Sequence, residues 1–341
     1  MKKVVLNILK VVIPLLVGVY IIWDVFGQLD QTEKESMFTS IQEAEYGWIV
    51  ISIIFGIMSH MSRAYRWKYL LAPMGYKPGF INSFFAVMIG YLINLILPRV
   101  GEVSRCGVLS KYEKIPFSKL LGTVIAERIA DMTILATIIV IVIIVELNTI
   151  NMLLQSILPQ NLDTSYLLML AGIGFLVCIV LAFIAYQILK RSVNTVVVKI
   201  KGLVIGFADG LKSIMKMENS GKFIFHTLFI WFLYIVMFYV IFFTLEETSN
   251  VPIPGMLAAF ALGGLSLIFI QGGIGIYPAA IMKVLLLYGV AEGPGAALGW
   301  IIWTAQTVML LIFGLFSIVL VSWYNKRINQ NDQATPDTVK N

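Results

Sequence analysis

Apolar runs long enough to cross a bilayer recur along the whole chain, and they restrict the folds available to it. A helix of about 20 apolar residues spans the hydrocarbon core, and runs of roughly this length lie near residues 6–26, 46–62, 120–147, 165–189, 223–244 and 297–323. The sequence is 59% hydrophobic and only 13% charged, whereas soluble domains are about 25% charged. Because only helices and closed barrels satisfy their backbone groups in lipid, we predict an all-α polytopic integral membrane protein.

A further apolar stretch, 80–97, ends in Pro and Gly and is followed by basic residues. Lys2, Lys3 and Lys10 place the N-terminus in the cytoplasm by the positive-inside rule, and the acidic loop 27–45 then lies outside. If 80–97 crossed the membrane, five basic residues would follow it on the outer side: Arg99, Arg105, Lys111, Lys114 and Lys119. We therefore predict that it turns back, as a re-entrant hairpin near 80–118.

The stretch 252–290 is a second broken apolar run, interrupted by several Pro and Gly residues. The last span must end inside, at Lys326 and Arg327, so 252–290 must begin and end outside as a second re-entrant hairpin. Broken segments that enter from opposite faces are typical of the inverted repeats of transporters. The prediction is a single transmembrane domain over 1–327, with about six full spans, two inverted hairpins and cytoplasmic termini.

Two remaining segments are expected on the cytoplasmic side. Apolar residues recur at helical spacing near 193–217 with lysines between them, which predicts an amphipathic helix on the membrane surface; an ordinary helix packed under the bundle is the alternative. Residues 328–341 are polar and short, and we expect a disordered tail without a soluble domain.

Charged residues at the end of the first broken run are the first candidates for a functional site. Arg99, Glu102 and Arg105 follow the run 80–97 directly, and a charge within a membrane protein normally faces a partner or a wet cavity. A second cluster comprises Glu127, Arg128 and Asp131, whose spacing places Glu127 and Asp131 on one helix face. Together these clusters predict a cationic pocket for an anionic headgroup, because guanidinium binds phosphate oxygens in pairs. A salt-bridge network that pins the hairpin to the helix is the alternative.

Glycines in Gln271–Pro278 are the other candidates. Gly272, Gly273 and Gly275 would allow the backbone to approach a ligand or another helix closely, and both interpretations stay open. No phosphate-loop pattern is present. The two histidines, His60 and His226, have no carboxylate at ligand spacing, so we predict no metal, no cofactor and no histidine-based catalysis, and we assign His60 to the membrane interface.

Three ordered motifs resemble the lysylphosphatidylglycerol synthase transmembrane-region family. They are Leu97–Arg105 (LPRVGEVSR), Glu127–Asp131 (ERIAD) and Gly272–Ile276 (GGIGI), and the likeness covers roughly residues 10–325. The resemblance implies a flippase-like domain of the bacterial inner membrane that moves a phospholipid between leaflets. It implies headgroup-binding roles for Arg99, Gly101, Glu102, Arg105, Glu127, Arg128, Asp131, Gly272, Gly273 and Gly275.

Two departures from the family pattern shape the expected function. The chain ends shortly after its last span, so we expect no synthase domain and no enzyme activity; Tyr277 and Pro278 follow the glycine motif where relatives often carry an acid. We expect a lipid flippase or transporter whose partners are membrane lipids, chiefly an anionic phospholipid, and not nucleic acid. A second copy of the chain or a separate lipid-modifying enzyme would be the protein partner. The alternative functions are a membrane-embedded lipid-modifying enzyme and a small-solute transporter.

Overall fold

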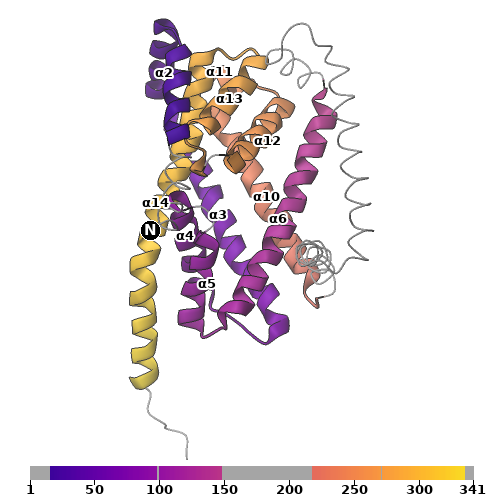
Figure 1. Ribbon diagram of the computed structural model, residues 1–341, viewed down its shortest axis with the longest axis vertical. Helices are drawn as coiled ribbons and strands as arrows, with labels where there is room; N and C mark the ends of the chain where they lie inside the picture. The colour runs from indigo at the N-terminus through magenta and orange to yellow at the C-terminus, as the bar shows by residue number, and fades with distance from the viewer. Residues whose placement is uncertain (1–15, 98–99, 148–216, 270, 335–341) are drawn as a thin grey trace, which may run out of the picture. The chain divides into compact units, whose positions relative to one another are not determined.

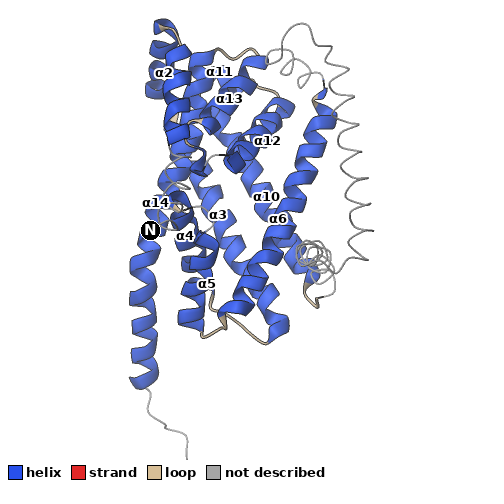
Figure 2. Cartoon of the chain, viewed as in Figure 1, coloured by secondary structure: helices blue, strands red, loops and turns tan. Residues whose placement is uncertain are grey.

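Every regular element in the described part of the chain is helical (Figure 2). The computed structural model describes residues 16–97, 100–147, 217–269 and 271–334. Four helices there are long and apolar enough to cross a membrane: Tyr46–Met74, Phe117–Val145, Ser220–Thr244 and Glu292–Ile328. They correspond to four of the six predicted spans, and the prediction of an all-α polytopic membrane protein is confirmed. The predicted span 165–189 and the amphipathic helix 193–217, apart from Met217, lie outside the described residues.

The chain divides into two compact units, one formed by residues 1–125 and 218–341 and the other by residues 126–217. The first unit contains helix Leu16–Gln28 and most of the labelled elements (Figure 1). Its main helices are α2 (Gln31–Glu43), α3 (Tyr46–Leu71), α4 (Phe80–Ile96), α5 (Val100–Glu113), α10 (Ser220–Val240), α12 (Ile253–Phe269), α13 (Ile276–Leu287) and α14 (Glu292–Ala334). Helix α6 (Phe117–Val145) begins in the first unit and continues into the second.

Helix α2 replaces much of the outer loop that we expected over 27–45. The Asp30 side chain accepts a hydrogen bond from the Glu33 N–H (2.7 Å), and the Glu33 side chain accepts one from the Asp30 N–H (2.8 Å). This reciprocal capping box satisfies two backbone donors at the start of the helix. The Asp-x-x-Glu spacing was visible in the sequence, but the acidic composition of the segment suggested a loop.

Helices α4 and α5 form the first hairpin, and polar contacts fix their antiparallel alignment. Near the turn, the Asn94 side chain accepts a hydrogen bond from the Gly101 N–H (2.8 Å). At the far end, Asn82 Nδ2 donates to Glu113 Oε1 (2.7 Å). Between these contacts, a Cβ atom placed on Gly101 would collide with the carbonyl oxygen of Gly90. The two helices therefore cross at a distance that only glycine permits.

Helices α12 and α13 form the second hairpin around a turn of three left-handed glycines. Gly272, Gly273 and Gly275 have φ angles of 68°, 67° and 76°, a region that side chains with a Cβ rarely adopt. Gly263 packs against Tyr277, and Gly255 packs against Tyr288, so α12 and α13 run antiparallel. Helix α13 has 12 residues, about 18 Å of helix, which is shorter than the hydrocarbon core of about 30 Å.

Helix α14 runs beside both hairpins and shows that they point in opposite directions (Figure 1). At its start Glu292 pairs with Lys283, and Trp303 then donates a hydrogen bond to the Gly272 carbonyl (2.6 Å). Further on, Gly314 packs against Leu92, and Asn325 donates to the Asn82 side chain (2.7 Å). Along α14, Glu292 therefore lies at the open end of the second hairpin, and Trp303 lies at its turn. Gly314 then lies beside the turn-proximal half of α4, and Asn325 lies at the open end of the first hairpin. The two turns therefore face each other, and the second turn contacts α4.

The C-terminal end of α14 extends further than expected. The helix continues to Ala334, so the first residues of the predicted disordered tail are helical, and residues 335–341 lie outside the described part of the chain. No Pro or Gly interrupts the segment 324–335.

Substitution of Gly101 by Ala is expected to destabilise the first hairpin. The new methyl group meets the Gly90 carbonyl and the Asn94 side chain, and overpacking of this kind costs about 1–3 kcal/mol. The measurement is the thermal unfolding midpoint of the detergent-solubilised protein. Gly107→Ala is the matched control on the same helix, because a Cβ there meets nothing within 4 Å; equal loss of stability in both variants would contradict the close crossing.

Substitution of Trp303 by Phe is expected to loosen the second turn. Phe retains an aromatic ring, but the half-buried Gly272 carbonyl loses its donor, a change worth about 0.5–1.5 kcal/mol. Hydrogen exchange measured by mass spectrometry should become faster in residues 271–276 and stay unchanged in α10. Trp323→Phe, an exposed position on the same helix, provides the control, and unchanged exchange in Trp303→Phe would refute the anchoring role.

Candidate functional site

One face of α3 carries charged and aromatic side chains into the interior of the first unit. His60, Arg63 and Trp67 recur at helical spacing, and Arg66 lies beside them. Their exposed fractions are 5%, 2%, 0% and 0%, in the order His60, Arg63, Arg66 and Trp67. We had assigned His60 to the membrane interface, whereas the structure buries it within the helix bundle. From the sequence, Arg63 and Arg66 were expected to follow the span, because the apolar run ends at Ser62. Helix α3 instead continues to Leu71 and carries both arginines.

Helix α10 supplies hydrogen-bond partners for this face. Arg66 Nη1 donates to Thr227 Oγ1 (2.8 Å), and Arg63 Nη2 donates to Tyr234 Oη (3.3 Å). The Arg66 guanidinium also lies over the Phe223 ring, 5.1 Å from its centroid. Phe223, Thr227 and Tyr234 are separated by four and seven residues, so they share one face of α10. Two hydroxyls and one aromatic ring thus hold the arginines in place.

The first hairpin brings Arg105 to the same region of α3. Arg105 is 3% exposed, and its guanidinium lies over the Trp67 ring, 4.6 Å from the centroid. Trp67 is itself held by a hydrogen bond from Nε1 to Thr123 Oγ1 (2.7 Å). Arg63 and Arg66 belong to one stretch of α3, and Arg105 contacts the same stretch through Trp67; we call these three residues the arginine cluster.

His60 lies at the edge of the arginine cluster, one helical turn before Arg63. Its ring stacks on Tyr91 of α4, with 4.6 Å between centroids, and lies 6.4 Å from Tyr234. Its Nδ1 atom is buried and has no hydrogen-bond partner among the described residues. A buried polar atom that could bond a ligand thus lies beside the arginine cluster.

Gly101 and Glu102, two other predicted residues of the first hairpin, have structural partners. Arg99 lies outside the described residues. Glu102 accepts a hydrogen bond from Asn94 Nδ2 (3.2 Å), and Gly101 allows the close crossing with Gly90. Of the predicted set 99–105, Arg105 is the residue that the structure brings to the arginine cluster.

The second predicted cluster belongs to the second unit. Glu127 and Asp131 are buried, with exposed fractions of 0% and 6%, and Arg128 is half-buried. Their spacing on α6 places Glu127 and Asp131 on one helix face, as expected. The association of this cluster with the first hairpin stays a prediction.

The glycine motif 272–275 makes packing contacts with neighbouring helices. A Cβ on Gly275 would lie 2.7 Å from the Gly18 carbonyl oxygen and 2.9 Å from Ile22 Cγ1. A Cβ on Gly18 would in turn lie 3.0 Å from the Ile274 carbonyl oxygen. Close approach of helix Leu16–Gln28 therefore accounts for Gly275, and the bond from Trp303 uses the Gly272 carbonyl. These contacts favour the packing interpretation over a ligand cradle.

The chemistry available in the first unit is anion binding. Among the described residues, no group of three or more His, Cys, Asp or Glu side chains could hold a metal ion. Guanidinium groups present two parallel donors that match phosphate and carboxylate oxygens, and the arginine cluster combines three of them.

Comparisons with known proteins agree with the fold and the motifs. Residues 8–314 match the family model described as lysylphosphatidylglycerol synthase TM region. A stretch of 87 residues is 34% identical to the UPF0104 membrane protein MJ1595 of Methanocaldococcus jannaschii, and this match covers 25% of the chain and 26% of that protein. No solved structure matches the chain. Because the family model covers most of its length, the chain belongs to the lysylphosphatidylglycerol synthase transmembrane-region family, as a multi-pass membrane protein.

Proposed function

We propose that the protein is a lipid transporter that moves an anionic phospholipid across the bacterial inner membrane. The observation that carries this proposal is that three buried arginines, from α3 and α5, lie at one stretch of α3 inside an apolar helical bundle. A buried charge in a membrane protein is costly, and such residues commonly mark substrate pathways. The arginine cluster would bind the headgroup phosphate, and His60 Nδ1 would provide a further polar contact.

The arrangement of the two hairpins supports a role in transport and not only in holding the helix bundle together. Their turns face each other along α14, and the turn Gln271–Gly273 contacts α4. Transporters commonly bind substrates where broken helices meet near the middle of the membrane. In the proposed mechanism the headgroup passes through the polar interior of the bundle while the acyl chains remain in lipid. The sequence contains no phosphate-loop pattern, so the energy would come from a gradient or a partner, or transport would be passive.

Leaflet exchange in liposomes tests the proposal. Purified protein is reconstituted with fluorescent phosphatidylglycerol, and the fraction of label accessible to an impermeant quencher is followed over time. We expect Arg66→Gln and Arg105→Gln to slow exchange by about tenfold or more, because a lost charge-assisted hydrogen bond is worth about 1.5–3 kcal/mol. Arg66→Lys retains the charge without the planar fork and should recover only part of the rate.

Lys222→Gln is the matched control, since it removes one positive charge from an exposed position on α10. Exchange at the wild-type rate in both arginine variants would refute the role of the arginine cluster. Absence of exchange by the wild-type protein, together with a new lipid detected by mass spectrometry of the same liposomes, would favour the lipid-modifying enzyme. Uptake of a small solute without lipid exchange would favour the solute transporter.

The topology of the two hairpins forms part of the proposal. Positive-inside counting places the open end of α5 in the cytoplasm and the loop between α13 and α14 outside. We therefore expect Ala291→Cys to react with a membrane-impermeant maleimide in intact cells, and Lys111→Cys to react only after the cells are opened. Both positions are exposed. Labelling of Lys111→Cys in intact cells would overturn the re-entrant first hairpin.

A further inference from the structure

An apolar cavity lies in the first unit, at the end opposite the open end of the first hairpin. It has a volume of about 250 Å³ and is enclosed by helix Leu16–Gln28, α2, α13 and α14. Its walls are built from aliphatic and aromatic groups, including Ile22, Phe26, Phe38, Met282 and Trp300. Water needs two to four polar partners in a buried site, and cavities of about 150 Å³ lined by such groups stay dry and bind hydrocarbons. The wall chemistry therefore selects hydrocarbon.

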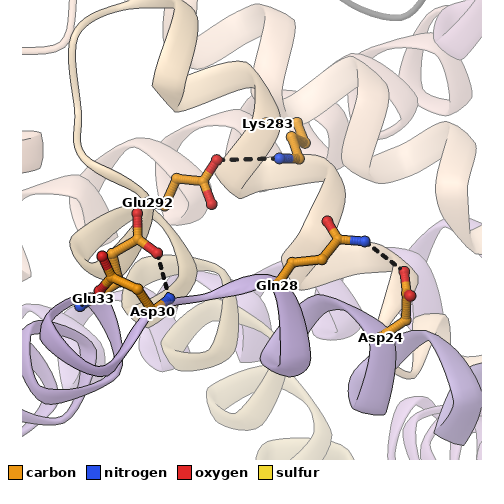
Figure 3. Close-up of polar contacts among 6 residues, drawn as sticks. All are labelled: Asp24, Gln28, Asp30, Glu33, Lys283 and Glu292. Carbon is orange, nitrogen blue, oxygen red and sulfur yellow. Dashed lines mark hydrogen bonds and ion pairs between the residues drawn. The ribbon is translucent and has the colours of Figure 1, made fainter.

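Six polar residues that lie close in sequence to the cavity lining contact one another in pairs (Figure 3). Each member is adjacent to a lining residue or lies one helical turn from one: for example, Lys283 follows Met282, and Glu292 precedes Ala296 by four residues. Lys283 Nζ donates to Glu292 Oε1 (3.2 Å). We call the six residues drawn in Figure 3 the polar rim: Asp24, Gln28, Asp30, Glu33, Lys283 and Glu292.

Two exposed aromatic rings connect the cavity with the surface. Phe26 and Phe38 line the cavity, yet they are 39% and 52% exposed. Their rings meet edge to face with centroids 6.3 Å apart. The outer face of helix Leu16–Gln28 is apolar as well, with Leu16, Tyr20 and Trp23 exposed. In a membrane protein such a face contacts lipid chains, so hydrocarbon is available at this opening.

We propose that the cavity binds one acyl chain of a membrane phospholipid, whose headgroup lies at the polar rim. An apolar chamber with polar residues close in sequence to its lining matches an amphiphile, with the chain pointing toward Gly275 and the headgroup toward Glu292. This site is distinct from the arginine cluster, which lines no part of the cavity. The inference goes beyond the proposed transport and does not depend on it.

Photocrosslinking tests the proposal. The full-length protein is reconstituted into phosphatidylethanolamine vesicles that contain a trace of phosphatidylethanolamine with a diazirine near the end of one acyl chain. After illumination, labelled peptides are mapped by mass spectrometry. We expect labels on cavity-lining residues, in particular Met37, Met282 and Trp300. Labelling confined to outward-facing positions such as Trp23 and Val319 would overturn the proposal.

Ala279→Leu fills part of the cavity and should reduce labelling of its lining about tenfold, because it displaces roughly two methylenes of the chain. Ala280→Leu is the matched control: the neighbouring residue is also half-buried but does not line the cavity. Undiminished labelling in a folded Ala279→Leu protein would overturn the proposal.

A competition experiment with the wild-type protein in detergent covers the case in which Ala279→Leu does not fold. Long-chain phosphatidylethanolamine should prevent labelling, whereas a short-chain form with the same headgroup should not. Equal competition by both would contradict recognition of the chain. Labelling by a diazirine fatty acid but not by the phospholipid probe would also overturn the assignment to a phospholipid. The readout is binding, so it is independent of whether the protein transports lipid.

Discussion

A helix that ends inside a membrane protein leaves backbone groups without intrahelical partners, and their satisfaction decides whether the two hairpins can exist. In the first hairpin the Asn94 side chain accepts the hydrogen bond of the Gly101 N–H. In the second, Trp303 of α14 donates to the Gly272 carbonyl. Both turns therefore depend on side chains next to them in space, and α14 serves both hairpins. Their opposed arrangement follows from packing against this one helix.

The arginine cluster lies where the first hairpin meets α3. A guanidinium inside an apolar bundle needs partners for its donors, and α10 presents the Thr227 and Tyr234 hydroxyls as acceptors. Trp67 contributes to both parts of the structure, because it stacks under Arg105 and donates to Thr123. Architecture and proposed binding chemistry thus share the same residues, so variants need a separate measure of folding.

The candidate site was only partly predictable from sequence. Arg105 was singled out because a charge after a broken apolar run is unusual. Arg63, Arg66 and His60 were missed, because a hydropathy window ends a span at the first charges and treats them as boundary residues. The signal that could have found them is the spacing of His60, Arg63 and Trp67, which places them on one face. The glycine motif was noticed correctly, but the choice between ligand and packing needed the position of Gly18.

The sequence by itself determined the all-helical class, most span positions and the sites of the two breaks. These features depend on local properties: the length of apolar runs, and the prolines and glycines that interrupt them. Only the tertiary structure decided that the hairpin turns face each other, that α3 carries buried arginines, and that four helices line an apolar cavity. Each of these depends on residues far apart in the chain, such as Asn82 with Asn325. Helix hydropathy and periodicity do not specify which distant helices pack together, because many apolar faces are chemically equivalent until specific side chains interlock.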